Sequence, residues 1–255
     1  MISQYIEVLI LAFIQGFSEF IPVSSSAHLL IISKIYNFNI GSLHLDISFH
    51  LGSLLAIIFY FKSDLLSITK NKNIFSLIIL GSLPLIVVGY LFLTIGFIDY
   101  FRNLKIIAWT TLIFGLLLFF ADRSQIKKKL DTNLNYKSIL IVGMFQLLAI
   151  IPGVSRSGIV ITIGRFLKFN RVDSTKISLY LSIPAIAGAS FLSLNEIASK
   201  NTEFNILILL SIIFSFIFSF LTIKYFLIYV KNFSLNIFVV YRILLSLILF
   251  YFIYA

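Results

Sequence analysis

Long apolar stretches alternate with short polar ones along the whole chain, and their lengths sort the apolar stretches into two kinds. A helix needs about 20 apolar residues to cross a membrane. Six stretches approach that length and carry almost no charge: 47–61, 75–93, 106–120, 177–195, 204–223 and 235–254. The pattern therefore predicts six transmembrane helices.

Two further apolar stretches, 8–21 and 139–151, are too short to span. Each runs into a proline and several polar residues, and a second short apolar run follows, 27–33 or 159–167. Apolar runs of 10–14 residues are typical of re-entrant segments, and irregular backbone at membrane depth requires protein or water around it. We predict two helical hairpins that each enter the membrane and return on the same side.

The composition agrees with a membrane protein. Hydrophobic residues make up 60% of the 255 residues and charged residues 12%, whereas soluble domains carry about 25% charged residues. The length fits a single membrane domain, 1–255. The absence of cysteine excludes disulfides and thiolate metal sites. We attribute the net charge of +10 to membrane topology and expect no nucleic-acid partner.

The positions of lysine and arginine predict the topology. Fourteen of the 20 lie in loops that we assign to the cytoplasm by the positive-inside rule, 62–74, 121–137, 164–176 and 224–234, and four lie in 33–46, 94–105 and 196–203. This assignment requires both hairpins to be re-entrant. Each half, 1–121 and 137–255, then has one hairpin and three spans in opposite orientations, joined by a cytoplasmic linker, 122–136. The fold class predicted is an all-α polytopic membrane protein with an inverted repeat.

The two hairpin tips are similar in sequence. IPVSSSAH, residues 21–28, aligns without a gap to IPGVSRSG, residues 151–158. The alignment places Ser25 opposite Ser155 and Ser26 opposite Arg156. The alignment thus divides the chain into the same two halves as the positions of lysine and arginine.

Polar residues of the first hairpin are suited to binding an anion. Gln15 and Glu19 are four residues apart and share a helix face. Ser24, Ser25 and Ser26 lie where the next helix begins, and free N–H groups at a helix start attract anions. His28 follows within the first turn.

The second hairpin places Ser155, Arg156 and Ser157 at the start of its second helix. Arginine suits phosphate because its planar fork donates hydrogen bonds in pairs. If the two tips meet, helix starts, hydroxyls and Arg156 form one phosphate site. Structural interpretations compete: the serines could only cap helices, and Arg156 could only neutralise Glu19. Charges at membrane depth are costly, however, which favours function for the cluster.

Three other polar residues are open to either interpretation. Asp46 and His50 lie one helical turn apart, so they either bond to each other or reach the site. Arg242, alone in the last span, is interpreted as a structural ion-pair partner.

The motif QGFSEFIPVSSSAH, residues 15–28, closely resembles the first signature of the undecaprenyl-pyrophosphate phosphatase family, the bacitracin-resistance membrane phosphatases. PGVSRSG, residues 152–158, resembles the second signature. FHLGSLLAIIFYF, residues 49–61, and the Tyr-Arg pair at 241–242 resemble further family positions. The resemblance extends from about residue 4 to the C-terminus.

The resemblance implies a function and roles for these residues. The family hydrolyses a C55 prenyl diphosphate to the monophosphate and recycles a lipid carrier for cell-wall synthesis, with Mg²⁺ or Ca²⁺ as cofactor. Glu19, Ser25, His28 and Arg156 are implied to be catalytic, and Gln15, Ser24, Ser26, Ser155 and Ser157 to bind substrate. Gln15 replaces a glutamate of many members, so it receives only a binding role. The implied location is the bacterial cell membrane, with membrane lipids around the chain and the active site opening to the external face. A homodimer is left open.

The sequence leaves the mechanism open between two nucleophiles. In the preferred version Ser25 attacks and His28 acts as general base and later acid. In the other, His28 is the nucleophile and forms a phosphohistidine. Glu19 either orients His28 or helps to hold the metal. The main rival function is a lipid-phosphate transporter or flippase, because inverted repeats with broken helices are a transporter architecture. The type 2 phosphatidate phosphatases are excluded, since no histidine follows His50.

Overall fold

The computed structural model describes residues 2–36, 43–70, 72–199 and 206–254, and all regular elements in these ranges are helices. This confirms the all-α class. The first half contains α1 Ile2–Ser18, α2 Ser25–Tyr36, α3 Leu43–Tyr60, α4 Lys62–Lys70, α5 Lys72–Thr94, the 3₁₀ helix η1 Phe97–Phe101 and α6 Leu104–Asp122. The linker contains α7 Leu130–Asn133. The second half contains α8 Tyr136–Gln146, the 3₁₀ helix η2 Leu147–Ile150, α9 Arg156–Phe166, α10 Arg171–Ser199, α11 Ile206–Asn232 and α12 Asn236–Tyr254.

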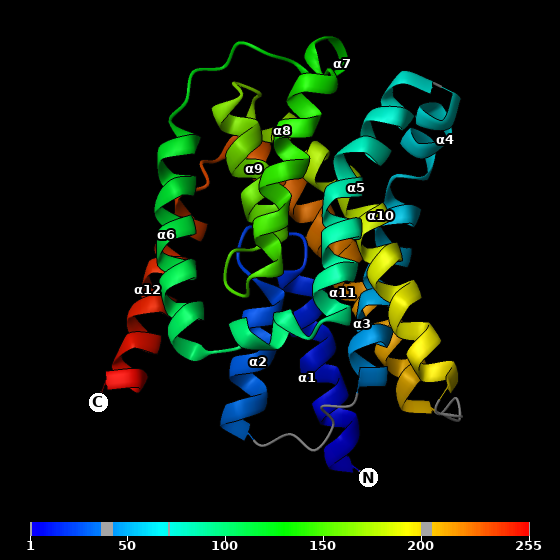
Figure 1. Ribbon diagram of the computed structural model, residues 1–255, viewed down its shortest axis with the longest axis vertical. Helices are drawn as coiled ribbons and strands as arrows, with labels where there is room; N and C mark the ends of the chain where they lie inside the picture. The colour runs from blue at the N-terminus through cyan, green and yellow to red at the C-terminus, as the bar shows by residue number, and fades with distance from the viewer. Residues whose placement is uncertain (1, 37–42, 71, 200–205, 255) are drawn as a thin grey trace.

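Two helical hairpins occupy the positions that the short apolar runs predict. In Figure 1, α1 rises from the lower end and α2 returns to it, while α8 descends from the upper end and α9 returns there. Both turns lie at mid-height in this view. The first helix ends at Ser18, earlier than the apolar run to residue 21 suggested, because the chain begins its turn at Glu19.

Within the described residues, four helices are long and apolar enough to cross a membrane: Asn73–Thr94, Leu104–Asp122, Ile206–Asn232 and Asn236–Tyr254. These segments correspond to four of the six predicted spans and show a multi-pass membrane protein. By the same measure Leu45–Tyr60 is a shorter apolar helix, and α10 is not among the candidates although it has 29 residues. The count of six spans therefore stays a prediction.

Helices of the two halves pack against each other in the centre of the molecule. The α11 helix packs on both α1 and α3, α5 packs on α8 and α10, and α12 packs along α6. Small residues allow the closest approach: a Cβ added to Gly52 on α3 would lie 2.4 Å from the carbonyl oxygen of Ile212. Beside this contact, the Ser219 hydroxyl donates to Ser53 over 2.8 Å. Both features are typical of helix interfaces within membranes.

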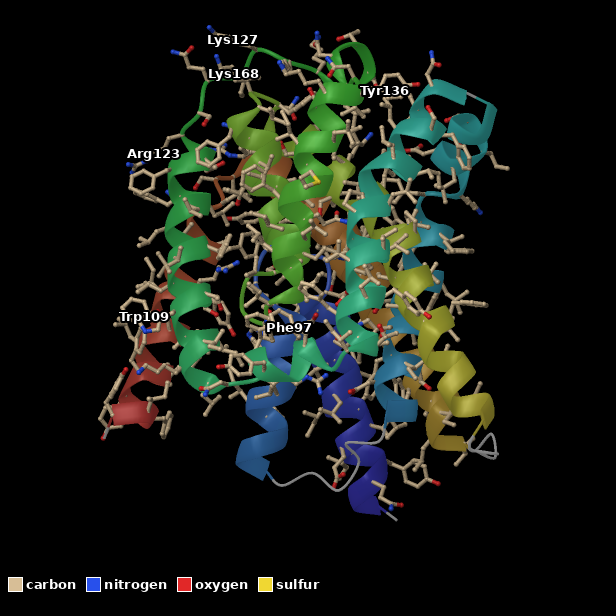
Figure 2. All side chains as sticks on the ribbon, viewed as in Figure 1. Phe97, Trp109, Arg123, Lys127, Tyr136 and Lys168 are labelled. Carbon is tan, nitrogen blue, oxygen red and sulfur yellow. The ribbon has the colours of Figure 1, made fainter. Side chains whose placement is uncertain are left out.

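A buried ion cluster joins the loops at the upper end of Figure 1. Asp122, at the end of α6, accepts from Arg171 Nε over 2.7 Å and lies 3.7 Å from Arg165 Nε. Arg165 also donates to the carbonyl oxygen of Ser124 over 2.7 Å. Figure 2 labels Lys127 and Lys168 at this same end. The lysine-rich end is thus held by α6, α9 and α10 together.

Candidate active site

The two hairpin tips are bonded to each other. The Ser157 hydroxyl donates to the carbonyl oxygen of Ile21 over 2.6 Å, and the Gly153 N–H donates to Ser24 Oγ over 3.2 Å. These bonds join turns that lie more than a hundred residues apart in the sequence. The expectation that the tips meet is therefore confirmed.

Matching serines cap the helices that follow the two turns. Ser24 Oγ accepts from the N–H of Ala27 over 3.4 Å, and Ser155 Oγ accepts from the N–H of Gly158 over 3.1 Å. Each capping serine also lies beside the hydroxyl two residues later, at 3.2 Å and 3.1 Å. The capping geometry makes Ser24, and not Ser25, the counterpart of Ser155.

The alignment of the tips without a gap is therefore wrong by one residue at the helix starts. The second turn holds one residue more between its proline and its capping serine. Gly153 accommodates the longer turn at φ +91°, where a Cβ would lie 2.2 Å from Thr110 Oγ1. Ser155 also has a positive φ, 70°, which is uncommon for a residue with a side chain and is found preferentially at functional sites.

With this correction Ser25 and Arg156 occupy the same place, the first residue of a helix, in the two hairpins. Both side chains bind one carboxylate, that of Glu19. Ser25 Oγ donates to Glu19 Oε2 over 2.7 Å, and Arg156 Nη2 donates to Glu19 Oε1 over 2.8 Å. Gln15, one turn earlier on α1, adds a bond of 2.9 Å to Glu19 Oε2. Glu19 is 8% exposed and accepts hydrogen bonds from both hairpins.

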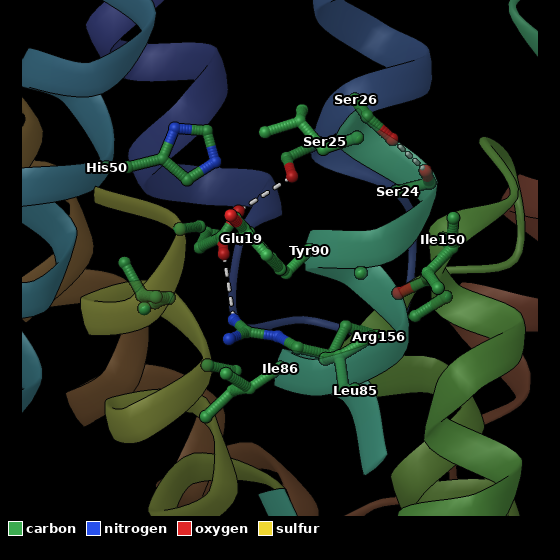
Figure 3. A pocket seen from close by; sticks show the side chains of 18 of the residues that line it. Glu19, Ser24, Ser25, Ser26, His50, Leu85, Ile86, Tyr90, Ile150 and Arg156 are labelled. Atoms are coloured by element: carbon green, nitrogen blue, oxygen red, sulfur yellow. Dashed lines mark hydrogen bonds and ion pairs between the residues drawn. The ribbon is translucent and has the colours of Figure 1, made fainter. Parts of the chain in front are cut away.

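These polar groups line one end of a cavity of about 320 Å³ (Figure 3). The polar lining consists of Ser18, Glu19, Ser24, Ser25, Ser26, His50, Ser155 and Arg156. The remaining lining comes mostly from α5 and α10: Leu85, Ile86, Gly89, Tyr90, Leu93, Ala185, Ile186, Gly188 and Ala189, with Ala149 and Ile150. The cavity therefore joins a polar end, suited to an anion, to an apolar wall.

Two predicted binding residues lie outside this lining but beside it. Gln15 is fully buried and binds Glu19, while Ser157 is buried and joins the tips. The structure thus gives both residues contacts that hold the site together.

His28 is also absent from the residues that line the cavity. Its Nδ1 lies 2.5 Å from the carbonyl oxygen of Ser24, and its Nε2 bonds to the Tyr241 hydroxyl. The structure therefore does not show the predicted contact between Ser25 and His28. The partners explain the difference: His28 bonds back to the main chain of its own helix and across to Tyr241 on α12, whereas Ser25 bonds to Glu19.

His50 on α3 does line the cavity, and in Figure 3 its ring points toward Glu19 and Ser25. Its Nδ1 lies 2.8 Å from the main-chain oxygen of Asp46, and Asp46 itself does not line the cavity. The sequence left this residue undecided. The signals of function were its place within a predicted span and within the segment 49–61 that resembles family positions.

Arg242 forms no ion pair among the described residues, so its interpretation as an ion-pair partner is wrong. It is 1% exposed and donates only to main-chain oxygens: Thr111 at 3.1 Å, Pro22 at 3.2 Å, Gly153 at 2.8 Å, and Val154 at 3.1 Å from each terminal nitrogen. One guanidinium therefore holds the turns of both hairpins against α6 and α12.

The donor groups do not form a metal site by themselves. Within the described ranges, no group of three or more His, Asp or Glu side chains is placed to hold a metal ion. Glu19 is the one carboxylate in the cavity lining, and both its oxygens accept hydrogen bonds, one of them from a cation. Mg²⁺ and Ca²⁺ prefer several oxygen ligands, which this set does not supply.

Comparison with known proteins finds relatives over the full chain. The protein named undecaprenyl-diphosphatase in Pelagibacter ubique (strain HTCC1062) is 54% identical over 255 residues, which is 100% of both chains. Proteins of the same name are 38% identical in Elusimicrobium minutum (strain Pei191), over 96% of both chains, and 36% identical in Alteromonas mediterranea, over 98% of both. The family described as bacitracin resistance protein BacA matches residues 8–248. That match includes the turns of both hairpins, the cavity and Arg242, and the chain therefore belongs to the bacitracin resistance protein BacA family.

Proposed function

We propose that this chain is an integral membrane undecaprenyl-diphosphatase, which hydrolyses a C55 prenyl diphosphate to the lipid monophosphate and inorganic phosphate. The observation that carries the proposal is the convergence of Ser25 and Arg156 on Glu19 inside a cavity with an apolar wall. A nucleophile and a phosphate-binding cation thus each bond to the same proton acceptor. The full-length relatives that bear this name support the same activity.

The substrate would bind with its diphosphate at the polar end of the cavity. The N–H groups at the starts of α2 and α9 and the guanidinium of Arg156 favour an anion there. The hydroxyls of Ser26 and Ser155 line the same end. The first isoprene units would lie along the wall that α5 and α10 provide, and the rest of the chain among membrane lipids.

In the reaction Ser25 Oγ attacks the terminal phosphorus, and the bond to the bridging oxygen breaks to release the lipid monophosphate. Glu19 Oε2 already accepts the Ser25 proton over 2.7 Å, a distance suited to a general base. Arg156 would turn part of its fork from Glu19 to the phosphate and stabilise the negative charge that develops on it. In this mechanism Glu19 takes the proton of Ser25, a role that the sequence analysis assigned to His28. The hydrogen bonds of His28 suit it to holding α2 in place.

The divalent cation remains a prediction from the family. Because the cavity lining offers one carboxylate, already bonded to Arg156, a cation would enter with the diphosphate oxygens and find few ligands in this lining. No step of the proposed reaction depends on it. A homodimer likewise remains a prediction.

We propose the inverted repeat as the architecture of this site, with halves 1–121 and 137–255 and the linker 122–136, which contains the one-turn helix α7. Reciprocal packing supports it: α1 packs on α11 of the other half, and its counterpart α8 packs on α5. The matching caps at Ser24 and Ser155 support it as well. With the lysine-rich end in the cytoplasm of a bacterial cell, the first hairpin enters from outside and the cavity opens outward.

The direct experiment measures phosphate release from a C55 diphosphate by the purified full-length protein in detergent. We expect steady release by the wild type and loss of most of it in Ser25→Ala. A protein that moves the lipid between leaflets of a vesicle but releases no phosphate would be a flippase, and that result would overturn the proposal.

A further inference from the structure

The proposed reaction passes through a phosphorylated Ser25, and a second proton transfer must complete it. Water has to attack the phosphoserine, and a base has to take its proton. After the first step Glu19 has received the proton of Ser25, and its other oxygen faces Arg156. The hydrolytic half of the reaction therefore calls for another acceptor at the cavity.

His50 meets this requirement among the residues that line the cavity. Apart from Glu19, their side chains are hydroxyls, aliphatic groups, the guanidinium of Arg156 and the phenol of Tyr90. None of these accepts a proton readily near neutral pH, whereas an imidazole does. Among the residues that line the cavity, the imidazole of His50 on α3 is therefore the group suited to accept this proton.

The hydrogen bond of His50 fixes which nitrogen is available. A carbonyl oxygen can only accept, so the contact of 2.8 Å between Nδ1 and the oxygen of Asp46 places the hydrogen on Nδ1. In the neutral ring Nε2 then carries the lone pair. Figure 3 shows the ring directed toward Glu19 and Ser25, with Arg156 on the far side of Glu19.

His28 does not offer an equivalent group. Its two nitrogens bond to Ser24 and to Tyr241, and its ring stacks on that tyrosine with centroids 5.6 Å apart. It lies outside the cavity lining, so water bound at Ser25 would not meet its lone pair.

We infer that His50 is a catalytic residue, the base that activates water for hydrolysis of the phosphoserine. Nε2 takes a proton from water as the water oxygen bonds to phosphorus, the bond between phosphorus and Ser25 Oγ breaks, and protonated Glu19 returns its proton to Ser25 Oγ. The imidazolium gives its proton to the departing phosphate. Phosphate leaves and the enzyme regains its starting state. The inference rests on the proposed function, because it presupposes the phosphoserine.

The test follows both products from a C55 diphosphate labelled in its terminal phosphate. In His50→Gln we expect one rapid equivalent of lipid monophosphate per enzyme, an acid-stable phosphoserine that persists, and steady phosphate release reduced about 10²–10⁴-fold. The double variant Ser25→Ala/His50→Gln should retain no label. Normal steady release by His50→Gln, or slow release with no trapped label, would overturn the inference.

Chemical rescue provides a second measurement. His50→Ala leaves room in the cavity for free imidazole, which should raise the rate of phosphate release in a saturable way and discharge the trapped label. A ring with only a structural role would not give this response. His28→Ala is the matched control, and equal rescue there would contradict the inference. A wild type that forms no phosphoenzyme but still releases phosphate overturns the inference alone, whereas a wild type that releases none overturns the proposed function too.

Discussion

The guanidinium of Arg156 and the carboxylate of Glu19 lie 2.8 Å apart, although 137 residues separate them in the chain. Each comes from a different hairpin, so the pair joins the two halves at the site. If Arg156 also binds the phosphate, Arg156→Ala should lose about 10²–10³-fold in turnover, the usual effect of removing one electrostatic donor. Steady-state phosphate release measures this.

Arg156→Lys distinguishes charge from geometry. Lysine keeps the charge but lacks the planar fork, so it should restore little activity. If instead Arg156→Ala folds and retains near-normal turnover, Arg156 serves only to neutralise Glu19.

Ser25 should carry the phosphoryl group during turnover. Ser25→Ala is expected to abolish most turnover, whereas Ser24→Ala should be milder because Ser24 caps the helix and does not bond to Glu19. Rapid-quench trapping with labelled substrate tests the assignment. An acid-stable label supports phosphoserine, and an acid-labile, base-stable one would instead indicate a phosphohistidine.

We expect a substitution of Arg242 to act first on the stability of the folded protein and only through it on the reaction. Its removal leaves buried carbonyl oxygens of Pro22, Gly153 and Val154 without their donor. Leaving one buried acceptor unpaired typically costs about 1–3 kcal/mol. We expect Arg242→Gln to lower the thermal unfolding midpoint in detergent clearly, and an unchanged midpoint would show that the turns are held by other contacts.

The effect of an added methyl group on stability can be compared at two glycines, Gly153 in the longer turn and Gly89 on α5. Gly153→Ala places a Cβ at φ +91° and 2.2 Å from Thr110 Oγ1, so it should be destabilising. Gly89→Ala on α5 meets nothing within 4 Å and replaces a helical glycine, which should leave stability equal or raise it by up to about 1 kcal/mol. Unfolding midpoints of both variants measure the difference, and equal midpoints would contradict the strained turn.

Single cysteines can test the orientation, since the chain has none of its own. Tyr100, which is 80% exposed in η1, should be external, and Lys127 should be cytoplasmic. An impermeant thiol reagent on intact cells should label Tyr100→Cys but not Lys127→Cys. The reverse pattern would invert the proposed topology. Of the predicted external segments 36–42 and 197–202, residues 37–42 and 200–202 lie outside the described residues.

The sequence predicted the parts of the site that depend on local pattern. Short apolar runs ending at Pro22 and Pro152 marked both hairpins, and serines after each proline marked the helix starts. It could not predict which way His28 faces, because that depends on how α2 is rotated in the folded protein.

The sequence also could not show which side chains form hydrogen bonds to main-chain atoms. Arg242 looked like half of an ion pair, since a buried charge usually has a charged partner. Its actual acceptors are carbonyl oxygens, which every residue possesses, so no residue type could reveal them. The shift of one residue between the tips depends on the conformation of Gly153, which appears only in the folded turn.

The bonds of Arg242 also bear on how the protein is made. Pro22 leaves the ribosome 220 residues before the side chain that binds its carbonyl oxygen. Until α12 is made, therefore, the two hairpins lie in the bilayer with carbonyl oxygens of their turns that lack the hydrogen bonds from Arg242. The site reaches its final form when α12 inserts, so a nascent chain stalled before this helix would contain Glu19, Ser25 and Arg156 without the guanidinium that holds both turns together.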